Sequence, residues 1–404
     1  MHRHKPPTTY SSLISREPAA AAGITRLQFL KGVAGVGVAA AAGGMLAGCG
    51  GGSASAGQSS RHIASIADLG KVGGTLVVVT YQGYEGGDAI KPWLATNHVD
   101  RRFQSINSQQ EATTKLKGAG GGTVDVVELA LLEGDSYVDM RIPLFLDLDW
   151  FPNGKRIRPF FADLFRQPDG TLSGIPFVWA ATPSNYRPDK ADPIESWSDL
   201  LKPAYRDRIT MIDDALANVA TASLALGHED PSKLTRDQLD EIGSFLKRMV
   251  AQARTITPSY GDMVQQLASG EVYATFSGWS ALEVFAAGAG AKVASAYPRE
   301  KSVGVVDAHA IPRSAPNKGT AAAFINEFLS DDMQRYVSRD LASGVVVNDA
   351  ATLLGNEKHL TFDYGDLDQL LEDRLAFVSA APLVPEAGYV SRQDWLDVWE
   401  AAKA

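Results

Sequence analysis

The apolar positions of the chain fall into short continuous runs and longer amphipathic stretches. Residues 76–80 are an unbroken, mostly β-branched run, which is typical of a strand buried on both faces. Residues 235–253 instead place apolar side chains at helical spacing behind the capping pair Thr235 and Gln238. The same reasoning predicts strands at 124–129, 175–179, 208–212, 272–276, 293–296 and 303–311, and helices at 281–287, 321–329 and 391–402. This alternation predicts an α/β fold with mostly parallel sheets.

The first 72 residues have a different pattern. An uncharged run over residues 32–45 is too short to span a membrane, which takes about 20 apolar residues, and basic residues flank its start as in a cleaved export signal. Residues 46–49, Leu-Ala-Gly-Cys, resemble a lipobox, in which the cysteine is lipidated and becomes the new N-terminus. We therefore expect 1–48 to be a cleaved lipoprotein signal peptide, with Cys49 as the lipid attachment site, and the protein to be anchored to a membrane in the periplasm or at the cell surface.

Two further features bear on this interpretation. A lone cysteine is also commonly a small buried residue, but the glycines on both sides of Cys49 offer no core to bury it. Residues 49–72 are rich in Gly, Ser and Ala and predict a flexible tether. Residues 25–31 resemble a twin-arginine export motif with Leu27 in place of the second arginine, so the sequence leaves the export route open.

The charge composition limits the classes of partner that the protein can bind. The chain has 404 residues and a formal net charge of −9, which becomes −13 without the first 48 residues. The remaining 356 residues suffice for two domains. Such a surface is a poor partner for nucleic acid, whereas a cationic ligand is compatible with it; acidity also simply favours solubility.

The sequence lacks the usual patterns of metal and catalytic sites. Its seven histidines include no pair at metal-ligand spacing. It has no P-loop, no Gly-x-Ser-x-Gly elbow and no dinucleotide fingerprint after a strand. We therefore expect no metal, no cofactor and no enzymatic activity; a catalytic set that meets only in the folded chain is the alternative.

Residues 193–214 carry the most specific pattern of the chain. Their sequence, PIESWSDLLKPAYRDRITMIDD, resembles the stretch SWxDLLxPxYxGxIxMxDD of the spermidine/putrescine-binding proteins of ABC importers. Other segments resemble the same family in the same order, at residues 115–127, 145–153, 267–276 and 307–317. The resemblance implies a type II periplasmic-binding-protein-like fold, with two α/β lobes joined by crossing hinge strands. It divides the chain into one lobe of residues 73–177 plus 304–345 and another of residues 178–303 plus 346–404.

The resemblance also implies a ligand site in the cleft between the lobes. In polyamine binders, carboxylates hold the ammonium groups and aromatic faces sandwich the methylene chain. Four residues match family positions: Tyr81, Tyr84, Asp214 and Asp307. Four others depart from the family pattern, which has acids at or near Gly83 and Ala217 and tryptophans at Ser277 and Val305. Glu85 and Trp279 are the neighbouring residues expected to substitute.

Alternatives remain for single residues and for the whole chain. Asp214 at a strand-to-helix junction also suits a helix N-cap, and Asp307 also suits a turn cap. The leading interpretation is a monomeric substrate-binding lipoprotein that captures a small cationic, polyamine-like solute and delivers it to ABC permease subunits. The alternatives are the same fold binding a different small solute, a ligand sensor, and an anchored hydrolase.

Overall fold

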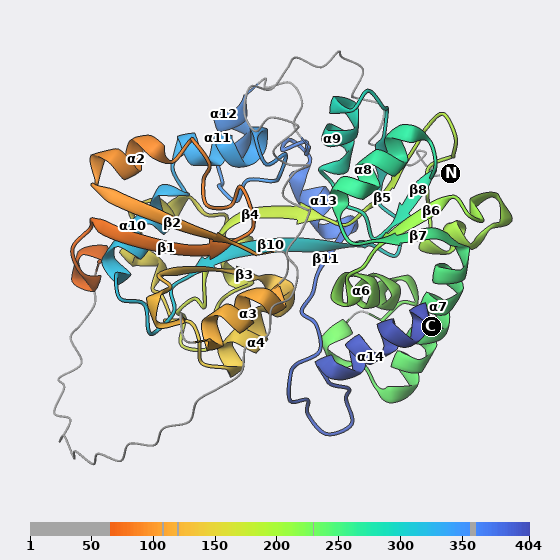
Figure 1. Cartoon of the computed structure of the whole chain (residues 1–404), viewed down its shortest axis with the longest axis horizontal. Helices are drawn as coiled ribbons and strands as arrows, with labels where there is room; N and C mark the ends of the chain where they lie inside the picture. The colour runs from red at the N-terminus through yellow and green to blue at the C-terminus, as the bar shows by residue number, and fades with distance from the viewer. Residues whose placement is uncertain (1–64, 107–108, 119–120, 229, 356–360) are drawn as a thin grey trace, which may run out of the picture.

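The computed structural model describes residues 65–404 except 107–108, 119–120, 229 and 356–360. Cys49, the signal peptide expected at residues 1–48 and most of the tether therefore lie outside the described residues. The described chain forms two β-sheets covered by helices, and the long strand β10 (Ser302–Ala310) runs across the middle of the molecule (Figure 1). Within this part of the chain, no helix has both the length and the hydropathy that a bilayer crossing requires.

The first sheet has the strand order β11-β10-β3-β1-β2, with β4 paired to β10. Strand β1 is parallel to β2 and β3, whereas β10 is antiparallel to β3 and β4. The other strands of this sheet are β1 Gly74–Thr80, β2 Val99–Ser105, β3 Val126–Ala130, β4 Ile175–Ala181 and β11 Leu375–Phe377. All five residues of β3 are buried, as expected for a central strand. This sheet and its helices are the first lobe.

The second sheet has the order β7-β6-β8-β5-β9 and is also mixed. Strand β6 is parallel to β7 and β8, and β5 is antiparallel to β8 and β9. Its strands are β5 Ser184–Tyr186, β6 Ile209–Ile212, β7 Ala253–Thr257, β8 Ala274–Phe276 and β9 Ala294–Ala296. This sheet and its helices are the second lobe.

Helices cover both sheets. The first lobe contains α2 Lys91–Thr96, α3 Gln109–Lys117, α4 Gly134–Asp139, α5 Pro159–Asp163, α10 Lys318–Glu327, α11 Asp331–Arg339, α12 Ala350–Leu354 and α13 Leu367–Asp373. The second contains α6 Ala215–Ala225, α7 Arg236–Gln252, α8 Tyr260–Ser269, α9 Leu282–Gly288 and α14 Arg392–Lys403. Short 3-10 helices are η2 Ile66–Leu69, η3 Gly121–Thr123, η4 Leu131–Glu133, η5 Leu148–Trp150, η6 Pro152–Arg156, η7 Trp197–Leu201, η8 Pro203–Tyr205 and η9 Pro231–Lys233. Helix α7 has the predicted Thr235/Gln238 capping box and buries one apolar stripe.

The chain passes between the lobes three times, and the passages meet. The first follows β4 and the second leads into β10, and the Thr182 N–H just after β4 donates to the carbonyl of Val303, near the start of β10, at 2.9 Å. The third follows β11, whose Phe377 ring lies so close to Gly304 that a Cβ there would be 2.5 Å from the ring. The two-lobed α/β fold with crossing strands is therefore as predicted.

Two expectations need correction. The sheets are mixed rather than mostly parallel, because β10 runs antiparallel to β3 and β4 in the first sheet and β5 runs antiparallel to β8 and β9 in the second. Residues 346–355 and 361–375, which the predicted division places in the second lobe, pack in the core of the first through Leu353, Leu370 and Leu371. Only after β11 does the chain return to the second lobe, where α14 packs on α6 and α7.

Candidate functional site

Two acidic side chains lie together inside the first lobe. In the antiparallel register of β3 and β10, Glu128 is opposite His309, and Asp307 precedes His309 by two residues, so Glu128 and Asp307 share a face of the sheet. Glu128 is fully buried and Asp307 is 6% exposed. Their carboxyl groups are within hydrogen-bonding reach of each other.

Burial shifts both acids toward their neutral forms. It raises the pKa of Glu128 well above its usual range, and the nearby charge of Asp307 raises it further. Burial also raises the pKa of Asp307 to about 6, against the opposing effect of its hydrogen bonds with Glu128 and Tyr84. The Tyr84 hydroxyl donates to Asp307 Oδ2 at 3.1 Å. Burial and mutual repulsion therefore both favour a proton on this pair.

Aromatic rings stand beside this pair. Tyr81 and Tyr84, in the loop after β1, meet edge to face at 5.9 Å between ring centroids, and Tyr84 meets Phe177 at 5.2 Å. Burial raises the pKa of both tyrosines, and the surrounding acids raise it further. Both phenols therefore keep their protons and serve as hydrogen-bond donors beside the acids.

Asp214 approaches from the second lobe, where α6 contacts β10. It is the N-cap of α6, and its Oδ1 accepts the Ala217 N–H at 3.0 Å. The residue as a whole is exposed, but burial of its carboxyl raises the pKa of Asp214, against the opposing effect of the hydrogen bonds from the Ala217 and Leu216 N–H groups. The charge of Asp214 also raises the pKa of Tyr81 in the first lobe. Asp214 thus both caps the helix and faces the aromatic residues of the other lobe.

Trp279 belongs to an aromatic group of the second lobe. Its ring lies 5.3 Å from Tyr260 and 5.4 Å from Phe285. Burial raises the pKa of Tyr260 above its usual value, with further contributions from Asp214 and Asp307, so Tyr260 lies near acids of both lobes. The Trp279 N–H donates to Asn185 Oδ1 at 3.0 Å, which fixes the backbone that carries the ring.

Glu85 is placed differently from the other predicted site residues. Its Oε2 accepts the Gly83 N–H at 2.6 Å and so closes the loop after β1, in which Gly83 has a φ of 94°. None of the interactions described for Glu85 joins it to Glu128 or Asp307. The structure therefore groups Tyr81, Tyr84, Asp307, Asp214 and Trp279, and leaves Glu85 beside them as a loop residue.

The sequence analysis missed three members of the group, which are Glu128, Gln109 and Tyr260. Gln109 Nε2 donates to Glu128 Oε2, and its own Oε1 accepts the Tyr137 hydroxyl at 3.1 Å. The available signal for Glu128 was an acid inside the otherwise apolar run of β3. No local pattern marks Gln109 or Tyr260.

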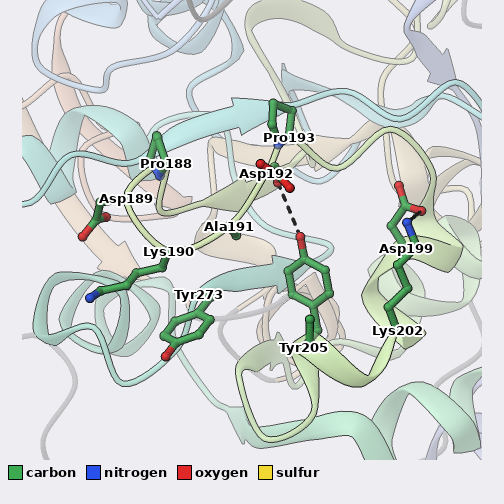
Figure 2. Close-up of a pocket in the computed structure, with 11 residues that line it drawn as sticks. Pro188, Asp189, Lys190, Ala191, Asp192, Pro193, Asp199, Lys202, Tyr205 and Tyr273 are labelled. Carbon is green, nitrogen blue, oxygen red and sulfur yellow. Dashed lines mark hydrogen bonds and ion pairs between the residues drawn. The ribbon is translucent and has the colours of Figure 1, made fainter.

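A separate pocket on the second lobe shows a different chemistry. It has a volume of about 420 Å³ and is lined by residues 188–193 with Asp199, Lys202 and Tyr205 (Figure 2). Two of its acids have basic partners, since Asp199 pairs with Lys202 at 2.7 Å and Asp189 with Arg187 at 2.8 Å. The pocket shares no residue with the acids between the lobes. Across the described residues, no group of three or more His, Cys, Asp or Glu could hold a metal ion.

Comparisons with known proteins agree with this architecture. The family model for bacterial extracellular solute-binding proteins matches residues 88–358. The spermidine/putrescine-binding periplasmic protein of Salmonella typhimurium is 25% identical over 245 residues, which cover 59% of this chain and 68% of that protein. The TpPotD lipoprotein of Treponema pallidum has a TM-score of 0.67 at 18% identity, covering 81% of this chain and 99% of that one. MotA of A. tumefaciens, solved with glucopine, has a TM-score of 0.58 at 14% identity, covering 81% and 98%.

Proposed function

We propose that this chain, which belongs to the bacterial extracellular solute-binding protein family, captures a polyamine-like cation between its two lobes. It is a solute-binding protein of an ABC transporter and not an enzyme. The ligand class is our inference, supported by the Salmonella relative and by the chemistry of the site.

One observation carries the choice of a cation. Among the described residues, no Lys or Arg forms an ion pair with Glu128, Asp214 or Asp307, and no basic group contributes to their pKa shifts. Unpaired acids in poorly hydrated surroundings are unfavourable, and a bound ammonium group would supply the missing positive charge. The rings of both lobes offer apolar and π faces for the rest of such a ligand.

Calorimetric titration of the purified protein with spermidine and putrescine tests the proposal. We expect saturable binding of at least one of them, together with a rise in melting temperature, because a ligand that binds only the folded state stabilises it. An uncharged solute of similar length is the matched control and should bind far more weakly. Tight binding of that control, with no binding of either polyamine, would reject a cationic ligand.

A different small solute is the second candidate. The MotA neighbour was solved with glucopine, so the same fold accommodates another ligand. Mass spectrometry of the compound that co-purifies with the protein separates the two candidates. A polyamine in the denatured extract supports the first, and a ligand without an amine supports the second.

We also infer that the protein is a monomer that delivers its solute to ABC permease subunits and is anchored by lipid at Cys49 in the periplasm or at the cell surface. Cys49 is the only cysteine, so a single substitution tests the anchor. Cys49→Ala should move the exported protein from the membrane fraction to the soluble fraction and abolish incorporation of labelled fatty acid. Retention in the membrane fraction would contradict the inference.

A further inference from the structure

We propose that Glu128 and Asp307 share one proton in the unliganded protein, and that an ammonium group of the bound solute displaces this proton to water. The identity of the displacing group rests on the proposed function, whereas the shared proton rests on the two buried carboxyls alone. It makes Glu128 a ligand-binding residue that the family resemblance did not include.

The placement of the two groups favours a proton between them. The carboxyls lie on one face of the sheet, both buried, within hydrogen-bonding reach. Two carboxylates offer only acceptors, so a hydrogen bond between them needs one to be protonated. The Tyr84 hydroxyl already donates to Asp307 Oδ2, which favours the charge on Asp307 and the proton on Glu128.

Gln109 fixes the orientation of Glu128. The Tyr137 hydroxyl donates to Gln109 Oε1, so the amide directs its N–H toward Glu128 Oε2. The other oxygen, Glu128 Oε1, is fully buried and accepts no hydrogen bond from any described donor. Oε1 is thus the oxygen left to carry the proton shared with Asp307, and once that proton has left, the N–H donors of an ammonium group would satisfy the buried acceptor.

The surrounding titratable groups supply no positive charge. On β10, His309 is the register partner of Glu128, and burial lowers its pKa to about 3, so it is neutral. The other groups that face the pair are Tyr81 and Tyr84 after β1, Gln109 on α3, Tyr137 on α4, Glu133 in η4 and Asp214 across the lobes. Each is neutral or acidic, so within the described residues only a proton compensates the pair.

The proton balance follows directly. The unliganded pair carries one proton and a charge of −1. When the ammonium group binds, the O–H bond of the shared proton breaks, the proton passes to water, and two carboxylates accept the ammonium N–H bonds. Affinity should therefore rise with pH below the apparent pKa of the pair, by up to about tenfold per pH unit for one released proton.

A ligand-free measurement tests the pair itself. Carboxyl ¹³C NMR of protein labelled at Asp and Glu should show both carboxyls responding to the same two titration steps, one of them above pH 5.5. Glu128→Gln should leave a single step for Asp307, and Asp307→Asn a single step for Glu128. Asp100→Asn on the exposed face of β2 removes the same charge from the same sheet and should change neither signal. Two independent titrations below pH 5 would overturn the proposal.

A second measurement tests the displacement. Titration with spermidine at pH 6.5, in two buffers of different ionisation enthalpy, gives the number of protons released. We expect up to one proton for the wild type and for Asp100→Asn, and close to zero for Glu128→Gln. Wild-type binding without proton release, or full release by folded Glu128→Gln, would overturn the displacement. If spermidine does not bind at all, the polyamine function fails, while the NMR titration still decides whether the proton is shared.

Discussion

Glu128 lies within β3 and Glu133 in the η4 turn that follows it, but the two acids have opposite electrostatic surroundings. The Arg392 guanidinium, from α14 of the second lobe, donates to Glu133 Oε2 and also to the Ala381 carbonyl at 3.1 Å. Glu128 instead meets a second acid, Asp307. Glu133 therefore has a basic partner within the protein, and this pair joins the two lobes, whereas Glu128 has no basic partner among the described residues. In this molecule, the absence of a basic partner is what separates a candidate ligand site from a structural ion pair.

Breaking the Glu133–Arg392 pair should have the largest effect on stability. Arg392 is 6% exposed, and Arg392→Met would leave the Glu133 carboxylate largely buried without its partner. We expect a loss of about 3 kcal/mol in the free energy of unfolding, measured by urea denaturation at pH 7.

Two variants control this prediction. Arg236→Met breaks the exposed pair of Arg236 with Asp394 near the same end of α14 and should cost about 1 kcal/mol or less. The double change Glu133→Leu with Arg392→Met should recover part of the loss, because no unpaired charge remains. A loss for Arg392→Met as small as that for Arg236→Met would mean that the pair does not join the lobes.

His309 extends the comparison to a buried base without a partner. It stacks on Phe177 at 3.9 Å between centroids, neither ring nitrogen makes a well-aligned hydrogen bond with a described residue, and burial lowers its pKa to about 3 against the opposing effect of the Tyr84 backbone. Below about pH 6.5 the unfolded chain takes up a proton that the folded protein refuses, so stability falls as pH falls from 6.5 toward 3. His309→Phe should remove this pH dependence. The free energy of unfolding of the variant, minus that of the wild type, should therefore be about 2 kcal/mol higher at pH 5 than at pH 7.

The same denaturation series contains its own control. The raised pKa of Asp307 acts in the opposite direction, since the stability it contributes is present at low pH and lost as pH rises through about 6. Comparing each variant with the wild type at the same pH separates the two effects. Parallel stability curves for the wild type and His309→Phe would show that His309 titrates normally.

Asp213 and Asp214 are adjacent in the sequence but differ in whether they have a basic partner. Asp213 accepts hydrogen bonds from Trp399 and Lys403 at 2.8 Å, whereas Asp214 has no basic partner. Asp307→Asn should weaken polyamine binding about tenfold, or about 1.4 kcal/mol, and Asp214→Asn somewhat less because Asp214 as a residue is more exposed than Asp307. Asp213→Asn should lower stability and leave affinity unchanged. Titration calorimetry and thermal denaturation of the three variants check this, and unchanged affinity for all three would remove the acids from the ligand site.

The elements that the sequence predicted are those in which burial leaves a pattern. Strands β1 and β3 are central and apolar, and α7 has both a cap and a stripe, so all three were predicted close to their bounds. Strand β2 was missed because it is an edge strand with alternating exposure and contains Asp100, Arg101 and Arg102. Edge strands need little apolar surface, so hydrophobic patterning does not reveal them.

The candidate site was predictable only in part for a similar reason. Asp214 and Asp307 were found because they stand in motifs shared with a known family. Glu128 becomes informative only through the antiparallel register of β3 and β10, which are far apart in the sequence. Tyr260 joins the site through its ring contact with Trp279. This contact depends on the tertiary fold and leaves no local signal in the sequence.

Substitutions of Trp279 should have the smallest effect on ligand affinity, and they test whether this tryptophan contacts the ligand or only supports the structure. Trp399 is 1% exposed and donates its indole N–H to Asp213, whereas Trp279 is half-buried beside Tyr260. If the Trp279 ring faces a bound cation, Trp279→Leu should weaken polyamine binding by about two- to fivefold, which corresponds to about 0.5–1 kcal/mol for a cation–π contact at an accessible site. Trp279→Phe keeps an aromatic face and should retain most of the affinity in the same calorimetric titration. Equal losses for Leu and Phe would show that Trp279 acts by filling space rather than by its π face, and the acids alone would then define the cation site.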